Sequence, residues 1–162
     1  MLALADAWCE RSLRTSSQGS AFWSDELEVT AEWVGPQSLH HGPLGVYVVA
    51  ALTASARSDS RSQDLALDRF LELARQPARF LDLGGGLAGA LLGCALLWAA
   101  EPARLPDLSE AAGGLLLLLQ ERFAEYRPIG ASPQLPYLGI AHGWAGLLYA
   151  AITWLLASGQ EC

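Results

Sequence analysis

The chain has 162 residues, of which 52% are hydrophobic and 17% charged, and its formal net charge is -7 at pH 7. This length is typical of a single domain with a sizeable core, and the apolar content excludes a disordered chain. The sequence has no lysine and its ten arginines are scattered, which argues against nucleic acid as a partner.

The N-terminal part is predicted to be a helix followed by a mixed lead-in. Apolar residues at three- and four-residue steps predict a helix over residues 2–14. Alternating apolar and acidic residues over 22–34 favour a short strand pair or an extended segment. Trp23 and Trp33 in this segment are candidates for surface contacts.

The cysteines indicate the cellular compartment in which the protein is found. Cys9, Cys94 and Cys162 show no paired spacing, which is typical of reduced thiols, and Cys94 is most simply a small core residue. The N-terminus also lacks the basic segment of a signal peptide. We therefore expect a cytoplasmic protein.

Three uncharged helices are predicted, each opened by a G-x-x-G pair. The pairs are Gly42 and Gly45, Gly86 and Gly89, and Gly143 and Gly146. Their first glycines lie 44 and 57 residues apart, a spacing typical of helical-hairpin repeats. We expect the first glycine to let the chain turn where a Cβ would clash, and the second to let a neighbouring helix approach closely.

Amphipathic helices are predicted between the uncharged ones. One spans 64–76, with Leu67, Phe70, Leu71 and Ala74 facing inward. Another is capped by Asp107 or Ser109 and runs to about Tyr126, and its Leu115–Leu119 segment is either core or an exposed interface. Because an uncharged helix is expected to be buried all round, the pattern predicts two layers, with the glycine-started helices inside.

The remaining elements complete this picture. Residues 127–137 form a loop with three prolines, and Gly159 stops the third uncharged helix. Trp98, Trp144 and Trp154 lie on uncharged helices and are predicted to pack in the core.

The uncharged runs also raise a membrane alternative. Residues 83–100 contain eighteen uncharged residues. However, residues 87–100 would form only about 21 Å of helix, against about 30 Å of hydrocarbon in a bilayer. The flanking Asp82 and Glu101 are acidic and give no positive-inside signal. We therefore expect no membrane association and keep a multi-pass membrane protein only as a third alternative.

The three glycine segments together resemble the lanthionine synthetase C-like (LanC-like) family over residues 33–159. The matching segments are Leu39-His40-His41-Gly42-Pro43-Leu44-Gly45, Asp82-Leu83-Gly84-Gly85-Gly86-Leu87-Ala88-Gly89 and Leu138-Gly139-Ile140-Ala141-His142-Gly143-Trp144-Ala145-Gly146. The resemblance implies an all-α fold, a partial α/α toroid of about three helical hairpins. Residues 1–37 would be the lead-in and 38–162 the incomplete ring.

The resemblance also implies a chemistry. Cyclases of the family add a peptide cysteine thiolate to a dehydroalanine or dehydrobutyrine, which closes a thioether ring in a precursor peptide. Their zinc is held by a tryptophan-cysteine motif and a cysteine-histidine-glycine motif on later repeats. This chain ends before either motif is expected, and Cys162 follows the third repeat too closely to replace one. Zinc is therefore expected only where a C-terminal half supplies these ligands, and none is expected in this chain.

Two residues match acid-base positions of the family, and each also has a simpler interpretation. Asp82, four residues before Gly86, is a candidate proton acceptor, although such an aspartate commonly caps backbone amides. His142, one residue before Gly143, can accept or pass a proton near neutral pH, but it can equally serve packing alone. We hypothesise that the two side chains converge.

Other sites and functions stay open. His41 occupies the same repeat position as His142, and a metal site formed by His40, His41 and His142 is conceivable but has no supporting local spacing. A half-ring suggests that the chain is truncated or pairs with a second chain. The leading function is a LanC-like peptide-modifying protein, inactive alone without zinc. The alternative is a non-catalytic peptide- or protein-binding module, and a glycosidase-type toroid is disfavoured because only Asp82 is a clear carboxylate candidate.

Overall fold

A computed structural model describes residues 1–16, 18, 26, 35–124, 135 and 137–160. The elements in these ranges are α1 (Leu2–Thr15), α2 (Pro43–Ala56), α3 (Ser60–Ala74), α4 (Leu87–Trp98), the short 3-10 helix η2 (Pro102–Arg104), α5 (Leu105–Ala124) and α6 (Trp144–Ser158). The predicted all-α class is confirmed, since the described part contains only an isolated bridge between Tyr137 and Gly143 besides helices. The predicted strand pair at 22–34, with Trp23 and Trp33, lies outside the described residues except for Glu26.

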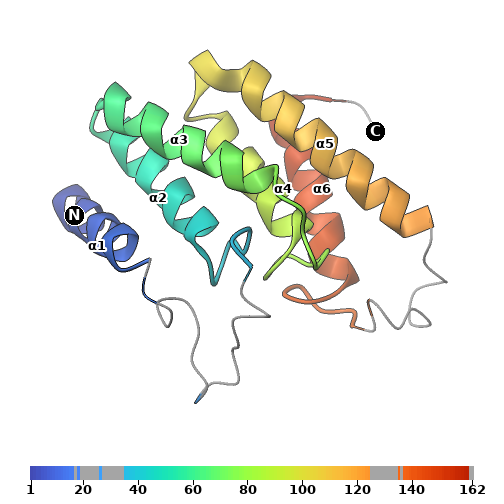
Figure 1. Cartoon of the computed structure of the whole chain (residues 1–162). Helices are drawn as coiled ribbons and strands as arrows, with labels where there is room; N and C mark the ends of the chain where they lie inside the picture. The colour runs from blue at the N-terminus through green and yellow to red at the C-terminus, as the bar shows by residue number, and fades with distance from the viewer. Residues whose placement is uncertain (17, 19–25, 27–34, 125–134, 136, 161–162) are drawn as a thin grey trace.

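The helices form the predicted alternation of charged and uncharged elements. The uncharged helices α2, α4 and α6 follow one another side by side, with α4 between the other two (Figure 1). The amphipathic helix α3 packs on α2, α5 packs on α4, and α1 packs on α2. Helix α3 thus packs mainly on the preceding uncharged helix α2 rather than on α4, and the alternating helices are consistent with a partial toroid.

Helix α4 is the centre of the core. Its residues Leu87, Ala88, Leu91, Cys94 and Leu97 are all buried. Such an uncharged helix gains stability only by packing on several sides, at roughly 25 cal/mol for each Å² of apolar surface removed from water. The position between α2 and α6 provides that burial for α4.

The three predicted core tryptophans do pack inside. Trp154 is fully buried, and Trp98 meets it edge to face with ring centroids 5.0 Å apart. Trp144 stacks on Phe123 at 5.2 Å, which ties α6 to α5. Edge-to-face and offset stacked geometries are the favourable ones for aromatic pairs.

Two predicted helix starts were wrong. Helix α3 begins at Ser60, because the Asp59 carboxylate accepts a hydrogen bond from the Ser62 amide and caps the helix four residues before the predicted start. Helix α5 begins at Leu105 after a 3-10 turn, so neither Asp107 nor Ser109 is its cap. Asp107 instead forms an ion pair with Arg104.

The expectation that every uncharged helix is buried all round is wrong. Helix α4 comes nearest to it, with Leu96 exposed, and Val49 of α2 is exposed as well. Leu148, Tyr149 and Ile152 of α6 are about half exposed. The Leu115–Leu119 segment, predicted to be either core or exposed, is both: Leu115 and Leu119 are buried, whereas Leu117 and Leu118 are exposed. Among the helices described here, none is sufficiently long and apolar to cross a bilayer.

The glycines of each pair allow the loop backbone to approach the helix start closely. Each first glycine is extended, with φ of -136°, -133° and -145° at Gly42, Gly86 and Gly143, so none needs a left-handed conformation. A Cβ on Gly86 would overlap the carbonyl of Phe80 in the same loop. The second glycines meet loop backbone rather than the neighbouring helix that we expected, since a Cβ on Gly89 would lie 2.5 Å from the Leu83 carbonyl oxygen.

Gly159 ends α6 as predicted. Its φ of 68° is in the left-handed region, which costs glycine little and other residues more.

Candidate functional site

The loops that precede α2, α4 and α6 gather at one end of the helical array (Figure 1). The Ser38 hydroxyl in the first loop donates a hydrogen bond to the Gly84 carbonyl in the second, at 2.7 Å. The Gly84 amide in turn donates to the Ala141 carbonyl in the third loop, at 2.9 Å. Buried backbone groups need such partners, so these bonds hold the three loops in a defined order.

Asp82 and His142 converge at the contact between the second and third loops. His142 Nδ1 lies 3.1 Å from Asp82 Oδ2. The carboxyl side chain is only 10% exposed, whereas the imidazole is 49% exposed. The hypothesis that these residues meet is confirmed, although they are 60 positions apart in the chain.

Asp82 also performs the capping function that was its alternative interpretation. Its Oδ1 accepts a hydrogen bond from the Gly85 amide at 2.7 Å, which forms a turn within the second loop. The equivalent residue of the first repeat is Ser38, whose hydroxyl accepts from the His41 amide at 2.9 Å. One Asp82 oxygen thus fixes its own loop and the other is available to His142.

Gly84 makes room for the histidine. A Cβ on Gly84 would lie 2.7 Å from His142 Cε1, closer than carbon atoms approach each other. The glycine-rich sequence of the second loop therefore does more than turn the chain, because it lets the imidazole lie directly against the backbone.

In chemical terms, the pair joins a buried acceptor to an accessible imidazole. A carboxylate that accepts from Nδ1–H fixes the ring tautomer and leaves Nε2 as the proton acceptor. The arrangement suits general acid-base catalysis, in which an imidazole takes a proton from one atom and returns it to another.

The comparison with protein families agrees with the helical fold. The family described as lanthionine synthetase C-like protein matches residues 13–161. The chain belongs to the lanthionine synthetase C-like family. No curated protein and no solved structure matches the chain.

The LanC-like family implies zinc, but the described residues of this chain do not fit it. Over these residues, no group of three or more His, Cys, Asp or Glu side chains is placed to hold a metal ion. The three-histidine metal site considered from the sequence, His40, His41 and His142, is therefore not formed in the structure. Cys94 is fully buried, and burial raises the pKa of its thiol to about 12, so it is a core residue as predicted. Cys162 lies outside the described residues.

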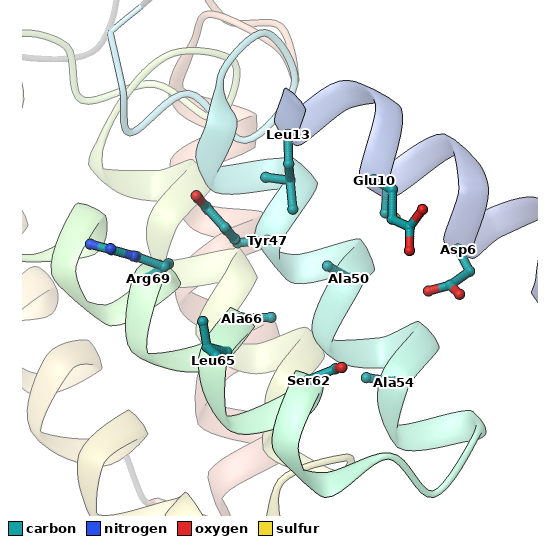
Figure 2. A pocket seen from close by; sticks show the side chains of 11 residues that line it. Asp6, Glu10, Leu13, Tyr47, Ala50, Ala54, Ser62, Leu65, Ala66 and Arg69 are labelled. Atoms are coloured by element: carbon teal, nitrogen blue, oxygen red, sulfur yellow. The ribbon is translucent and has the colours of Figure 1, made fainter. Parts of the chain in front are cut away.

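A pocket that the sequence did not reveal lies between α1, α2 and α3 (Figure 2). Its volume is about 340 Å³, and its floor includes the small side chains of Ala50, Ala54 and Ala66. Two of the charged residues at its edge are paired, since Asp6 bonds Arg57 and Arg69 bonds Glu72. Because its lining comes from three helices, no local motif could have predicted it.

Glu101 is a second feature that the sequence did not reveal. It is 3% exposed, and its Oε2 accepts a hydrogen bond from Gln63 Nε2 at 2.7 Å. Its Oε1 is buried with no hydrogen-bond partner among the described residues. Burial raises the pKa of this carboxyl. Glu101 follows the C-terminal end of α4, whereas Asp82 and His142 precede the N-terminal ends of α4 and α6, so it is not part of that site.

Proposed function

We propose that this LanC-like protein acts on a precursor peptide that carries a cysteine and a dehydroamino acid, and that Asp82 and His142 transfer the proton during thioether ring closure. The observation that supports the proposal is the 3.1 Å contact between a buried carboxylate and a half-exposed imidazole on two adjoining G-x-x-G loops. Both residues occupy positions that match acid-base residues of the family's cyclases.

The proton balance of the reaction suits a single acid-base pair. In a Michael addition the cysteine sulfur loses its proton and bonds the β-carbon of the dehydroamino acid, and the α-carbon gains a proton. One imidazole can accept the first proton and deliver the second, so no oxidant or reductant is required. The Asp82 carboxylate would keep Nδ1 protonated and orient the ring, so that Nε2 faces the reacting atoms.

Polarisation of the thiol by zinc is the part that this chain is not expected to supply. The described residues do not fit a zinc site. We therefore infer that a second chain, or a further segment carrying the zinc motifs, completes the active site. The chain alone is expected not to catalyse ring closure at neutral pH. Free thiols at Cys9 and Cys94 support a cytoplasmic location for this assembly.

The experiment uses a pH at which part of the thiol ionises without zinc. A peptide with one cysteine and one dehydroalanine is incubated with the chain at about pH 8, close to the usual thiol pKa of about 8.5, so that part of the thiol is ionised and part keeps the proton that the imidazole would transfer. Loss of free thiol and formation of the ring are followed by mass spectrometry. Wild type is expected to accelerate ring closure over the peptide alone, within the range of about 10²- to 10⁴-fold for a general acid-base group.

Two variants test whether any acceleration depends on the Asp82–His142 pair. His142→Ala is expected to abolish it, whereas His41→Ala, at the equivalent position of the first repeat, is expected to retain it. A wild-type rate equal to that of the peptide alone, measured while the peptide is bound, contradicts the catalytic proposal.

That result would support the second candidate, a non-catalytic peptide-binding module. The observation that favours this candidate is the lack of a metal-binding group among the described residues. A module would bind the same peptide with unchanged affinity after His142→Ala.

A further inference from the structure

The residue four places before the first glycine of a repeat has a side chain that reaches the loop of the next repeat. In the first repeat this residue is Ser38, whose hydroxyl donates to the Gly84 carbonyl at 2.7 Å. In the second repeat it is Asp82, whose Oδ2 lies 3.1 Å from His142 Nδ1. The third repeat has Gly139 at this position, which has no side chain. Two contacts of the same kind therefore join the three loops in succession.

The two contacts meet in a single peptide group of the second loop. The Gly84 carbonyl and the Gly85 amide belong to the same planar unit. The carbonyl accepts from Ser38, and the amide donates to Asp82 Oδ1 at 2.7 Å. A continuous series of hydrogen bonds thus runs from the Ser38 hydroxyl, through this peptide group and the Asp82 carboxylate, to the His142 imidazole.

Ser38 is placed to hold this peptide group in one orientation. Its side chain is fully buried, and both hydrogen-bonding functions of its hydroxyl are used, since the oxygen also accepts from the His41 amide at 2.9 Å. A buried and fully satisfied polar network specifies one arrangement of the groups that it joins. The peptide plane in turn sets the direction from which the Gly85 amide reaches Asp82.

The orientation of the Asp82 carboxylate decides whether it faces the imidazole. While Oδ1 is held by the Gly85 amide, Oδ2 is directed at Nδ1 of His142. Loss of Ser38 would have two opposite effects on this contact. A weaker bond at Oδ1 would leave slightly more charge on Oδ2, by the 10–30% or so that neighbouring hydrogen bonds change each other. A rotated carboxylate would weaken the contact far more, because hydrogen bonds weaken steeply as their angle falls.

We propose that Ser38 is a positioning residue for the Asp82–His142 pair and acts on it through the peptide group between Gly84 and Gly85. This inference rests on the proposed function, because it gives the first repeat a part in an acid-base site formed by the second and third. Ser38 fixes the peptide plane, the Gly85 amide fixes Oδ1, and Oδ2 remains directed at Nδ1.

The experiment measures the ¹⁵N chemical shifts of His142 and the proton shift of the Gly85 amide in the full chain. The variants are Ser38→Ala, which removes the hydroxyl, and Ser38→Cys, which keeps a weaker donor of similar size. The control is Ser55→Ala, because the Ser55 hydroxyl also joins α2 to a carbonyl of another repeat, that of Ala100, at 3.3 Å. Spectra are recorded at about pH 8.5, where histidine is ordinarily neutral. Circular dichroism confirms that each variant is folded.

The expected result is a change at His142 that depends on the residue at position 38. In wild type the carboxylate accepts from Nδ1–H, so one tautomer dominates and the Nδ1 and Nε2 shifts lie far apart. In Ser38→Ala this difference should become smaller as the ring adopts both tautomers, and the Gly85 amide proton should move to lower shift. Ser38→Cys should be intermediate, and Ser55→Ala should match wild type.

Two results would overturn the proposal. An unchanged or larger difference between the His142 shifts in folded Ser38→Ala would show that Ser38 does not orient the carboxylate. An equal change in Ser55→Ala would attribute the effect to general loosening of the repeats. If Ser38→Ala does not fold, Ser38→Cys decides by the same shifts.

The ring-closure assay separates this inference from the proposed function. Expected shifts in all variants, together with a wild type that does not accelerate ring closure, would support the positioning role and contradict the catalytic one. Acceleration by wild type that is retained in Ser38→Ala, with unchanged His142 shifts, would overturn the positioning role and leave the proposed function in place.

Discussion

Asp82 divides its carboxylate between two loops: Oδ1 accepts from the Gly85 amide at 2.7 Å, and Oδ2 lies 3.1 Å from His142 Nδ1. The first bond closes a turn in its own repeat, and the second reaches the next repeat. The residue therefore combines a structural function with a position in the candidate site, and the two functions can be separated experimentally.

Stability measurements on two Asp82 variants separate them. Asp82→Ala leaves the Gly85 amide without its acceptor in a buried loop, and we expect it to lower the free energy of unfolding by about 1–2 kcal/mol. Asp82→Asn retains an acceptor oxygen and should cost less. Urea denaturation followed by circular dichroism checks this order. Equal losses in both variants would mean that the Gly85 bond contributes little.

Two glycine substitutions should have opposite effects. In Gly89→Ala the new Cβ would lie 2.5 Å from the Leu83 carbonyl oxygen and 3.1 Å from Leu39 Cβ, so the loops must shift, at a cost of about 1–3 kcal/mol. In Gly113→Ala no atom lies within 4 Å of the new Cβ, and α5 should gain about 0.5–1 kcal/mol. Thermal unfolding reports both. A stabilised Gly89→Ala variant would refute the close contact between repeats.

Glu101 makes stability depend on pH. Because burial raises the pKa of this carboxyl in the folded state, its contribution to stability is present below the unfolded-state pKa and is lost as pH rises through the folded-state pKa. Glu101→Gln removes this titration. The unfolding free energy of Glu101→Gln relative to wild type should therefore be higher at about pH 7 than at about pH 4. A difference that does not change with pH would show that the carboxyl is not desolvated.

Cys94 should report on global unfolding. Burial raises the pKa of its thiol to about 12, and only the thiolate reacts with alkylating reagents. In the native protein we expect no modification of Cys94 by iodoacetamide, and rapid modification in denaturant. Peptide mapping by mass spectrometry distinguishes Cys94 from the other two cysteines. Fast labelling of Cys94 under native conditions would show that α4 is not closely packed.

The repeat pattern predicted most of the architecture because its signals are local. Each G-x-x-G pair is followed by an uncharged helix, and the amphipathic helix between two pairs shows its buried side in Leu67 and Phe70. The helix starts were less predictable, since the cap formed by Asp59 competes with other polar residues of the same loop. The positions of α1 and α2 relative to each other depend on packing and could not be read from the pattern.

The candidate site was likewise predictable only in part from the sequence. Asp82 and His142 were identified individually from their positions before repeat glycines. Their contact depends on how the second loop sits on the third, which the bond from the Gly84 amide to the Ala141 carbonyl determines. The burial of Glu101 was not predicted, because a charged residue after a helix end is normally solvated. Its hydrogen bond to Gln63 on another helix depends on the tertiary fold.

The most direct test of the Asp82–His142 pair is the tautomer of the imidazole, measured from the ¹⁵N chemical shifts of His142 in wild type and Asp82→Asn. In wild type the carboxylate should hold the proton on Nδ1. In Asp82→Asn the Gly85 amide retains the side-chain oxygen, the new amino group points at Nδ1, and the ring proton should move to Nε2. Identical shifts in the two proteins would contradict the pairing on which the proposed proton transfer rests.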